Sequence, residues 1–238
     1  LVALMLANNE IGTIQPVRET AEAAHSFGIP VLCDAVAACG QLPLDVSKIG
    51  TDYLVVSGHK IHGPKGIGFL YAKSGTPLSP LLDGGGQESG MRAGTENVAF
   101  AVGLAKALEG AALPQETDRL RALQTRLFDG LLSIEGTSVN GSMNPAFRLP
   151  GNVNISIPDL SAESILLLLD AAGISASAGS ACNSESTEPS HVLLAIGRER
   201  VAASSSLRFT LSPDQTEEEI DTIIRETARI VRLLRTAQ

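Results

Sequence analysis

The sequence predicts an α/β fold, and two observations support this prediction. Continuous apolar runs such as "LVALML" and "YLVVSG" alternate in the first half of the chain with loops and with segments of helical spacing. A continuous apolar run is typical of a strand that is buried on both faces of its sheet. Strands that alternate with helices therefore indicate a sheet that is covered by helices on both faces.

The elements of the first half follow from local signals. Pro16 and Gly28 bracket a helix over residues 16–26, because proline favours the start of a helix and glycine the position beyond its end. A second helix is expected over 98–112, after a glycine-rich polar stretch at 84–97 that is too long for a tight turn. Loops of this length often carry function. Strands are expected at 1–6, 29–36, 53–58 and 67–72.

The second half predicts a further α/β unit. Thr216 and Glu219 form a capping box in front of an amphipathic C-terminal helix. The apolar face of that helix consists of Ile220, Ile223, Ile224, Val231 and Leu234. The other expected elements are helices at 116–132 and 162–172 and strands at 152–157 and 204–212. We therefore predict two domains, residues 1–112 and residues 113–238.

Composition argues against several classes of partner. The net charge is -8 without a basic cluster, which disfavours nucleic acids and anionic membranes. No apolar run reaches the roughly 18 residues that a membrane helix requires. The three cysteines are irregularly spaced and form no disulfide framework, which favours a reducing cytoplasm. The opening "LVALMLANNE" has neither an initiator Met nor the pattern of a signal peptide, so we expect the C-terminal part of a longer protein.

Two side chains at strand ends suggest cofactor chemistry. Lys60 follows the strand "YLVVSG" among glycines, and Asp34 ends the strand "IPVLCD". Ligands bind at strand ends of α/β sheets because the loops there converge on one crevice. A shielded lysine there can form a Schiff base, and an aspartate can hold the pyridine nitrogen of pyridoxal phosphate protonated. From position alone, an ordinary loop residue is the better interpretation of Lys60, and Asp34 could simply cap the next turn.

A phosphate site is expected beside Lys60. Ser57 and His59 flank Gly58, and together they offer hydroxyl, imidazole and amide donors. Thr95, in "RAGTEN", offers the same chemistry from the long loop. His59 and His62 stand three residues apart, but no third ligand is evident, so the sequence supports zinc only weakly.

The cysteines fall into two groups. Cys182 lies in "SASAGSACNSESTEPSHV", a small and polar stretch that predicts a loop. An exposed thiol is a liability unless it is used, which favours a functional role over an accidental surface thiol. Cys33 and Cys39 are interpreted as small core residues.

Arg208 lies on a strand with one apolar and one polar face. Leu207, Phe209 and Leu211 share the apolar face, and Arg208 stands on the other. An arginine on a strand presents a rigid fork for a carboxylate, but a solvated face is about equally well supported.

Together these stretches resemble the cysteine desulfurases of the NifS/IscS type, which are fold-type I pyridoxal-phosphate enzymes of the class V aminotransferase family. The matching motifs are "ANNEIGTIQP", "CDAV", "SGHKIHGPKGIG", "GGGQESGMRAGTEN", "SAGSACNSESTEPSHVL" and "SLRFTLSPDQTEEEID". They occur in the family's order from one end of the chain to the other. The resemblance implies the C-terminal part of the large cofactor-binding domain, followed by the small domain that carries the catalytic-cysteine loop.

The resemblance implies roles for individual residues toward pyridoxal 5'-phosphate. Lys60 would be the Schiff-base lysine, and Asp34 would pair with the pyridine nitrogen. Ser57 and His59 would bind the phosphate. Asn9 would hydrogen-bond near the phenolic oxygen of the cofactor.

Other implied roles concern the substrate and partners. Thr95 would bind phosphate in the site of the other subunit of a homodimer. Arg208 would take the carboxylate of L-cysteine, and Cys182 would accept its sulfur as a persulfide, leaving L-alanine. Cys182 would then deliver the sulfur to an acceptor such as an iron–sulfur scaffold, and would act as a transient iron–sulfur ligand.

Two departures and two alternative functions accompany the resemblance. Ala37 stands where the family usually has a Gln that contacts the cofactor's phenolic oxygen, which leaves Asn9 alone there. The family's N-terminal portion, with further phosphate ligands and a histidine that stacks on the pyridine ring, has no counterpart here.

One alternative is another class V enzyme, such as a selenocysteine lyase or an aminotransferase. The other is a non-catalytic fragment that dimerises or docks a partner.

Overall fold

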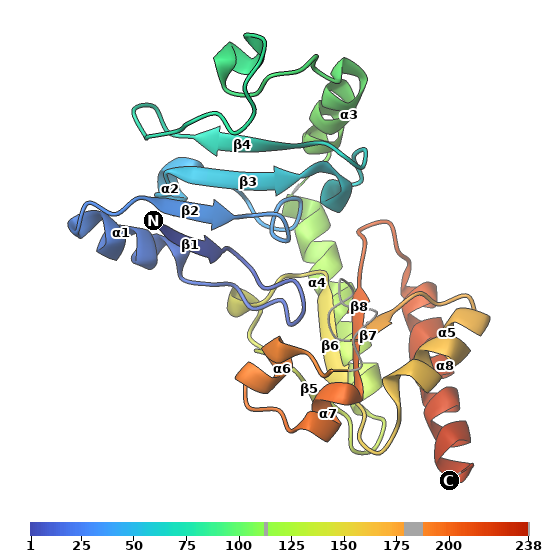
Figure 1. Cartoon of the computed structure of the whole chain (residues 1–238). Helices are drawn as coiled ribbons and strands as arrows, with labels where there is room; N and C mark the ends of the chain where they lie inside the picture. Colours follow the sequence, from blue (N-terminus) through green and yellow to red (C-terminus); the bar gives the residue numbers. More distant parts are fainter. Residues whose placement is uncertain (112–113, 179–187, 238) are drawn as a thin grey trace. The chain divides into compact units, whose positions relative to one another are not determined.

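The computed structural model describes residues 1–111, 114–178 and 188–237, which form two compact units (Figure 1). Unit 1 consists of Leu1–Ala7 and Gln15–Leu113, and unit 2 of Asn8–Ile14 and Pro114–Gln238. The division after 112 predicted from the sequence left 8–14 in the first domain, whereas this segment packs with unit 2. We call residues 8–14 the strap. Within the described residues, no helix is long and apolar enough to cross a membrane.

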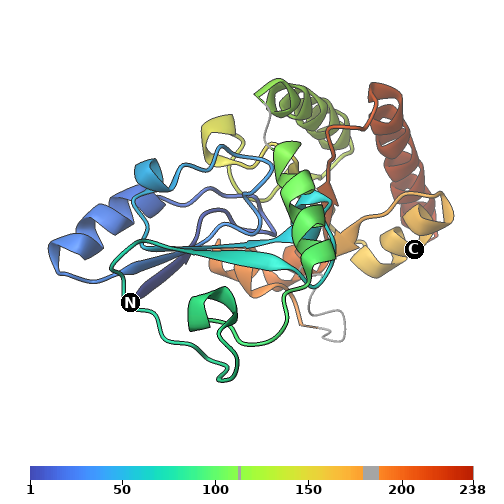
Figure 2. The ribbon, with the colours of Figure 1, turned by 90° about the horizontal axis from the view of Figure 1, so that it is seen from above.

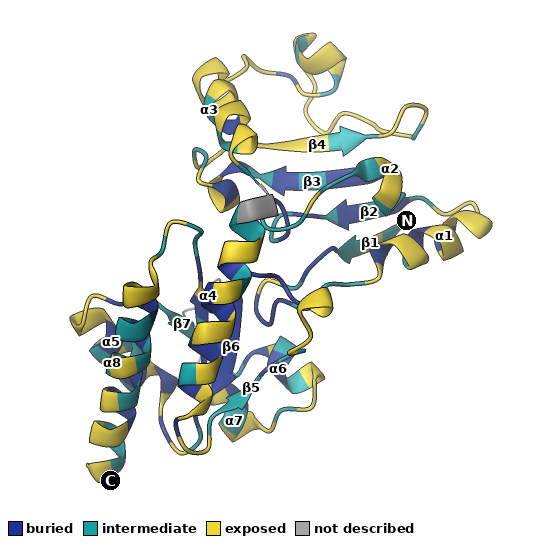
Figure 3. Cartoon of the chain, turned by 180° about the vertical axis from the view of Figure 1, so that it is seen from behind, coloured by how far each residue is buried: buried dark blue, intermediate teal, exposed yellow. Residues whose placement is uncertain are grey.

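Unit 1 contains a four-stranded sheet in the order β1-β2-β3-β4. Strands β1 (Val2–Met5), β2 (Val31–Asp34) and β3 (Tyr53–Ser57) are parallel, whereas β4 (Gly68–Ala72) is antiparallel to β3. Each strand lies within the apolar run that predicted it, so the four predicted strands are confirmed. Strands β2 and β3 are the most deeply buried, β1 is mostly half-buried, and β4 is mostly exposed in the described chain (Figure 3).

Helices and short turns complete unit 1. Helix α1 (Val17–Ser26) packs on one face of the sheet through Ala21 and Ala24, which contact Val31 (Figure 2). It begins after Pro16, as its sequence predicted, and Gly28 follows its end with a φ of 68°. The remaining elements are α2 (Val46–Ile49), α3 (Val98–Glu109) and the 3₁₀ turns η1 (Gly58–Ile61) and η2 (Gln87–Gly90).

Unit 2 contains an antiparallel sheet in the order β5-β6-β8-β7. Its strands are β5 (Ser138–Val139), β6 (Asn152–Ser156), β8 (Ser206–Thr210) and β7 (Ser177–Ala178). Its helices are α4 (Pro114–Leu132), α5 (Ala162–Ala171), α6 (His191–Ala195), α7 (Arg200–Ser204) and α8 (Glu217–Thr236), with the 3₁₀ turn η3 (Pro145–Phe147).

The core of unit 2 lies between its sheet and the long helices. Leu207 and Phe209 of β8 and Ile220 of α8 are almost fully buried in one apolar cluster, to which α4, β6 and α5 also contribute. Helices α4 and α8 approach closely at Gly130, where a Cβ would lie 2.3 Å from Ile224 Cδ1. A larger residue at 130 would therefore push the two helices apart.

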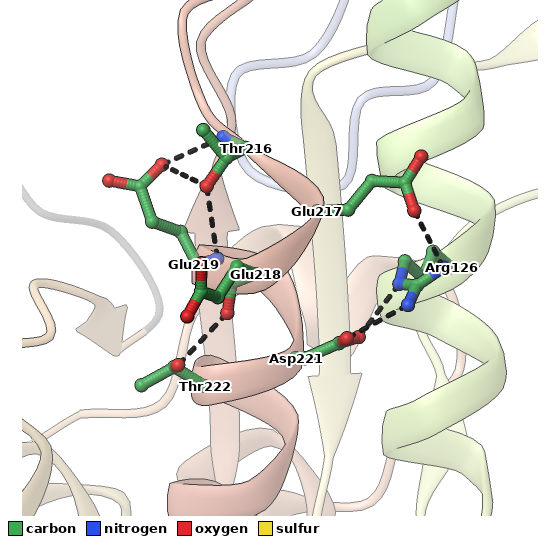
Figure 4. A network of polar contacts seen from close by, with 7 residues as sticks. All are labelled: Arg126, Thr216, Glu217, Glu218, Glu219, Asp221 and Thr222. Carbon is green, nitrogen blue, oxygen red and sulfur yellow. Dashed lines mark hydrogen bonds and ion pairs between the residues drawn. The ribbon is translucent and has the colours of Figure 1, made fainter.

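Polar contacts at the start of α8 confirm the predicted capping box (Figure 4). Thr216 Oγ1 accepts a hydrogen bond from Glu219 N at 3.2 Å, and Thr216 N donates to Glu219 Oε2 at 2.7 Å. Arg126 of α4 donates to both carboxylate oxygens of Asp221 and to Glu217. These ion pairs are solvent-exposed, so the cap and the apolar face define the helix and the ion pairs add little.

Candidate active-site residues

In unit 1, the predicted residues cluster at the carboxyl edge of the parallel strands. Asp34 ends β2 and Ser57 ends β3, and Asp34 stands opposite Val55 in the ladder. The turn η1 follows β3 directly and carries His59 and Lys60. Parallel strands present their carboxyl ends at one edge, so the fold gathers these side chains on one side of unit 1.

Asp34 is a half-buried carboxylate that the backbone orients. Its Oδ1 accepts a hydrogen bond from Val36 N at 2.9 Å. Through this oxygen Asp34 caps the turn after β2, which is the alternative interpretation that the sequence left open. Burial, with a smaller contribution from the charge of Asp34, raises the pKa of the Cys33 thiol to about 11. Cys33 and Cys39 are buried, as predicted, and burial also raises the pKa of Cys39. Neither thiol is suited to nucleophilic chemistry.

Ser57 and His59 form a polar pair at the end of β3. Ser57 Oγ lies 2.8 Å from His59 Nδ1, and Gly58 N donates to Ile67 O at 2.8 Å. Gly68 of β4 lies opposite Ser57 in the ladder. Only glycine fits there, because a Cβ at this position would lie 2.4 Å from Val56 O. A hydroxyl and an imidazole next to a tightly packed turn are suitable donors for a phosphate.

Lys60 and Thr95 are exposed within the described residues. The shielding of Lys60 expected from the surrounding glycines is therefore not seen in this part of the chain. Thr95 lies between η2 and α3, in a loop that Gln87 folds back by accepting a hydrogen bond from Gly94 N at 3.2 Å. Ala37 is half-buried in the turn after β2.

In unit 2, Arg208 is paired with the strap. It is half-buried on β8, opposite Asn154 of β6, and its Nη1 donates to Asn9 O at 3.0 Å. The side chain of Asn9 is exposed. Arg208 is therefore held by a defined partner and does not merely stand on a solvated strand face. Its guanidinium can still bind a carboxylate, since it carries five donors.

The sequence did not reveal the buried polar residues beneath the strap. Asn140 and Asn154 are both fully buried, and Asn140 Nδ2 donates to Asn154 Oδ1 at 2.8 Å. Arg148 is 1% exposed and donates to Ser142 O at 2.6 Å and to Asn140 O, and burial lowers its pKa to about 10. The only sequence signal was the polar alternation in "NVNISI", which does not distinguish a buried from a solvated face.

Cys182, including its assignment as a transient iron–sulfur ligand, lies outside the described residues. Within residues 1–111, 114–178 and 188–237, no three His, Cys, Asp or Glu side chains gather into a metal site. In this part of the chain, His59 and His62 therefore gain no third ligand for a zinc ion.

Several known proteins are similar to this chain. A family model described as "Aminotransferase class-V" matches residues 1–223. The chain belongs to the class V aminotransferase family. It is 48% identical to the cysteine desulfurase IscS of Methanosarcina thermophila and 46% identical to the cysteine desulfurase NifS of Azotobacter vinelandii. Each alignment covers 99% of this chain, but only 58% and 59% of the relatives, so the chain spans less than two thirds of their length.

A solved structure of a protein described as "NIFS-LIKE PROTEIN" has the same fold. The TM-score is 0.88 at 35% sequence identity, over 98% of this chain and 61% of that chain. The expected α/β fold, that of fold-type I pyridoxal-phosphate enzymes, is thereby confirmed. The resemblance to desulfurases of the NifS/IscS type is confirmed as well.

Pyridoxal 5'-phosphate is the cofactor of this family, and the residues of unit 1 fit it. An amine at Lys60, a carboxylate at Asp34 and the Ser57–His59 pair emerge from adjacent strand ends. These groups match the aldehyde, the pyridine nitrogen and the phosphate of the cofactor in chemical type. The individual residue roles remain predictions.

Proposed function

We propose that this chain carries the cofactor-lysine and catalytic-cysteine parts of a cysteine desulfurase. The enzyme would convert L-cysteine to L-alanine and leave a persulfide on Cys182. The observation that carries the proposal is the cluster of Asp34, Ser57, His59 and Lys60 at one edge of the unit 1 sheet. The relatives named as cysteine desulfurases support the choice of reaction within the family.

In the proposed mechanism each residue has one task. Bound pyridoxal phosphate supplies an aldehyde and an electron sink. Asp34 keeps a proton on the pyridine nitrogen, and Ser57 and His59 donate hydrogen bonds to the phosphate. Lys60 Nζ takes the proton from the substrate Cα. Arg208 binds the substrate carboxylate through its guanidinium.

Cys182 performs the sulfur chemistry in this proposal. Its thiolate attacks the substrate sulfur, so an S–S bond forms while the substrate's C–S bond breaks. The electron pair of the broken bond remains with the substrate carbon, which takes up a proton from solvent, and Lys60 returns the abstracted proton to Cα to give L-alanine. The persulfide sulfur then passes to an acceptor protein, such as an iron–sulfur scaffold, with Cys182 as a transient iron–sulfur ligand.

We also propose the assembly and location that the resemblance implied. The enzyme would be a cytoplasmic homodimer in which Thr95 reaches the phosphate of the other subunit's cofactor. The exposed position of Thr95 in its loop agrees with this role.

Reductive trapping tests the cofactor assignment. Pyridoxal phosphate is added to the purified protein, the adduct is reduced with borohydride, and the modified peptide is mapped by mass spectrometry. We expect stoichiometric pyridoxyl modification of Lys60 alone, with Lys60→Arg unmodified and Lys65→Arg modified as in the wild type. Lys65 is a matched control because it is exposed five residues further along the chain. Scattered labelling of surface lysines would overturn the assignment.

Release of sulfide and alanine from L-cysteine tests the reaction itself. We expect Cys182→Ala to abolish persulfide formation while pyridoxyl trapping at Lys60 persists. Full activity in Cys182→Ala would favour an aminotransferase, which does not need this thiol. A chain that does not bind pyridoxal phosphate would favour the non-catalytic alternative.

A further inference from the structure

The strap folds as a tight turn on β6. Asn8 Oδ1 accepts hydrogen bonds from Glu10 N at 2.9 Å and from Ile11 N at 3.0 Å. Gly12 has a φ of +70°, and a Cβ there would lie 2.7 Å from Asn152 Oδ1. The strap is therefore held against β6 at a distance that only glycine permits at position 12.

Glu10 is the one charged residue of the strap, and it is buried, with 2% of its surface exposed. Its backbone carbonyl accepts hydrogen bonds from Asn152 Nδ2 at 2.9 Å and from Asn154 Nδ2 at 3.0 Å. Its carboxylate Oε2 accepts the hydroxyl of Ser190 at 2.5 Å. A buried carboxyl group is costly unless it is paired, so this hydrogen bond compensates part of the cost of burying Glu10.

Ser190 connects the strap to α6. Its Oγ accepts hydrogen bonds from Val192 N at 3.2 Å and Leu193 N at 3.3 Å, which makes it the N-cap of this short helix. Leu193 is fully buried and packs in one cluster with Ile11 of the strap. The polar contact of Glu10 with Ser190 is thus supported by an apolar contact between their neighbours.

Arg208 depends on the same strap. Its Nη1 donates to the backbone carbonyl of Asn9, the residue that precedes Glu10. Any rotation of the Glu10 peptide would also move the Asn9 carbonyl, because the two residues share a peptide plane. The orientation of the Arg208 guanidinium is therefore linked to the anchoring of Glu10.

We propose that the Glu10–Ser190 hydrogen bond, which we call the clasp, positions Arg208. The clasp fixes the strap, and the Asn9 carbonyl of the strap accepts a hydrogen bond from the Arg208 guanidinium. Glu10 and Ser190 are positioning residues: they act through Asn9 and do not touch substrate. The importance of this orientation for substrate rests on the proposed function, in which Arg208 binds the carboxylate of L-cysteine.

The reactivity of Arg208 toward phenylglyoxal tests the clasp without requiring catalysis. Modification of Arg208 is followed by mass spectrometry, with the exposed Arg232 as the reference in the same molecule. Loss of one net hydrogen bond should raise the rate at Arg208 about fivefold. We expect this rise in Glu10→Ala and in Ser190→Ala, and no further rise in the double variant, because both changes open the same clasp.

Conservative variants and a matched control separate positioning from general damage. Glu10→Gln and Ser190→Thr keep the acceptor and the hydroxyl, so both should retain the wild-type rate at Arg208. Ser161→Ala is the control, because Ser161 is also an N-cap in unit 2 but makes no side-chain capping bond. If Glu10→Ala does not fold, the comparison of Ser190→Ala with Ser190→Thr still tests the proposal. Wild-type reactivity of Arg208 in Ser190→Ala would overturn the proposal.

A second arm distinguishes failure of the clasp from failure of the proposed function. Arg208 of the wild type is modified in the presence of pyridoxal phosphate and L-cysteine. Protection by L-cysteine supports Arg208 as the carboxylate site, and its absence counts against the proposed function alone. In an active preparation, Ser190→Ala should raise KM for L-cysteine about fivefold and change kcat less, and Ser190→Thr should restore KM.

Discussion

The two units hold their candidate functional residues in different ways. In unit 1, His59 and Lys60 are exposed on a short turn, and Asp34 is half-buried. In unit 2, Arg208 is fixed by a strap that rests on buried polar residues, among them Asn152 and Asn154. Substitution of exposed residues seldom changes stability, whereas removal of a buried hydrogen-bonding group does. Changes at the exposed His59 and Lys60 should therefore affect function alone, and changes beneath the strap should affect both.

The largest effect is expected for Lys60→Ala. A general base contributes about 10²–10⁴-fold to a reaction rate, so desulfurase activity should fall by that factor. This expectation rests on the proposed mechanism, in which Lys60 is the general base. Because Lys60 is exposed, the free energy of unfolding should change by less than about 0.5 kcal/mol. Assays of alanine formation and urea unfolding measure the two quantities. A large loss of stability would contradict the contrast between the units.

Arg148→Ala should produce the largest loss of stability. The change removes the donors to the carbonyls of Asn140 and Ser142, and also the contact with the ring of Phe128, whose centroid lies 5.0 Å from the guanidinium carbon. Unsatisfied buried carbonyls and a new cavity should together cost about 3 kcal/mol or more. Urea unfolding measures this cost, and the exposed Arg232→Ala serves as the control. Equal stability of the two variants would show that the buried polar residues do not support unit 2.

Thr216→Ala tests how much the cap of α8 stabilises unit 2. The capping box satisfies backbone donors at the start of α8, so its loss should cost about 1 kcal/mol. Ser161→Ala removes an N-cap side chain that makes no capping bond, and should cost much less. Thermal unfolding of the two variants compares them directly. A larger cost for Ser161→Ala would mean that the cap geometry does not determine helix stability here.

The smallest effect concerns Asp52 of unit 1, and it emerges only at acid pH. Burial alone would raise the pKa of Asp52, but hydrogen bonds from His25 at 2.7 Å and Val31 N at 2.8 Å outweigh it and lower the pKa. A lowered pKa in the folded state stabilises the protein above the pKa of the unfolded state, about 4. This stabilisation is lost as the pH falls through the folded-state pKa.

The pH dependence of unfolding measures this contribution. We expect stability to fall below about pH 4 in the wild type, and to fall less over the same range in Asp52→Asn, which has no carboxylate to titrate. Asp45→Asn is a useful companion, because Asp45 also has a lowered pKa but is the N-cap of the short helix α2. An identical acid response in wild type and Asp52→Asn would contradict the role of Asp52.

Sequence reasoning recovered the elements and residues with strong local signals. Asp34 and Lys60 stood after long apolar runs, and Thr216 and Glu219 had the spacing of a capping box. The structure places Asp34 at the end of β2 and Lys60 in the turn that follows β3. It also forms the capping box at the start of α8. Short elements such as α2 and α6 were missed, because four or five residues are too few to show a period.

The strap was missed for a different reason. The partners Glu10 and Ser190 are 180 residues apart, and neither shows a local pattern that reveals the other. The alternation in β6 predicted a polar face, but Asn152 and Asn154 are buried on it because the strap covers them. Burial of polar side chains by a distant segment is a tertiary effect that periodicity does not contain.

The strap also has a consequence for how unit 2 reaches its native state. Its residues 8–14 are inserted between two parts of unit 1, yet Ile11 and Glu10 complete the packing of α6. A polypeptide that starts at 114 would lack them, so it should need the strap as a separate peptide in trans or by circular permutation. During synthesis, the first segment of unit 2 emerges long before its partners, and closure over 180 residues is an entropically costly late event.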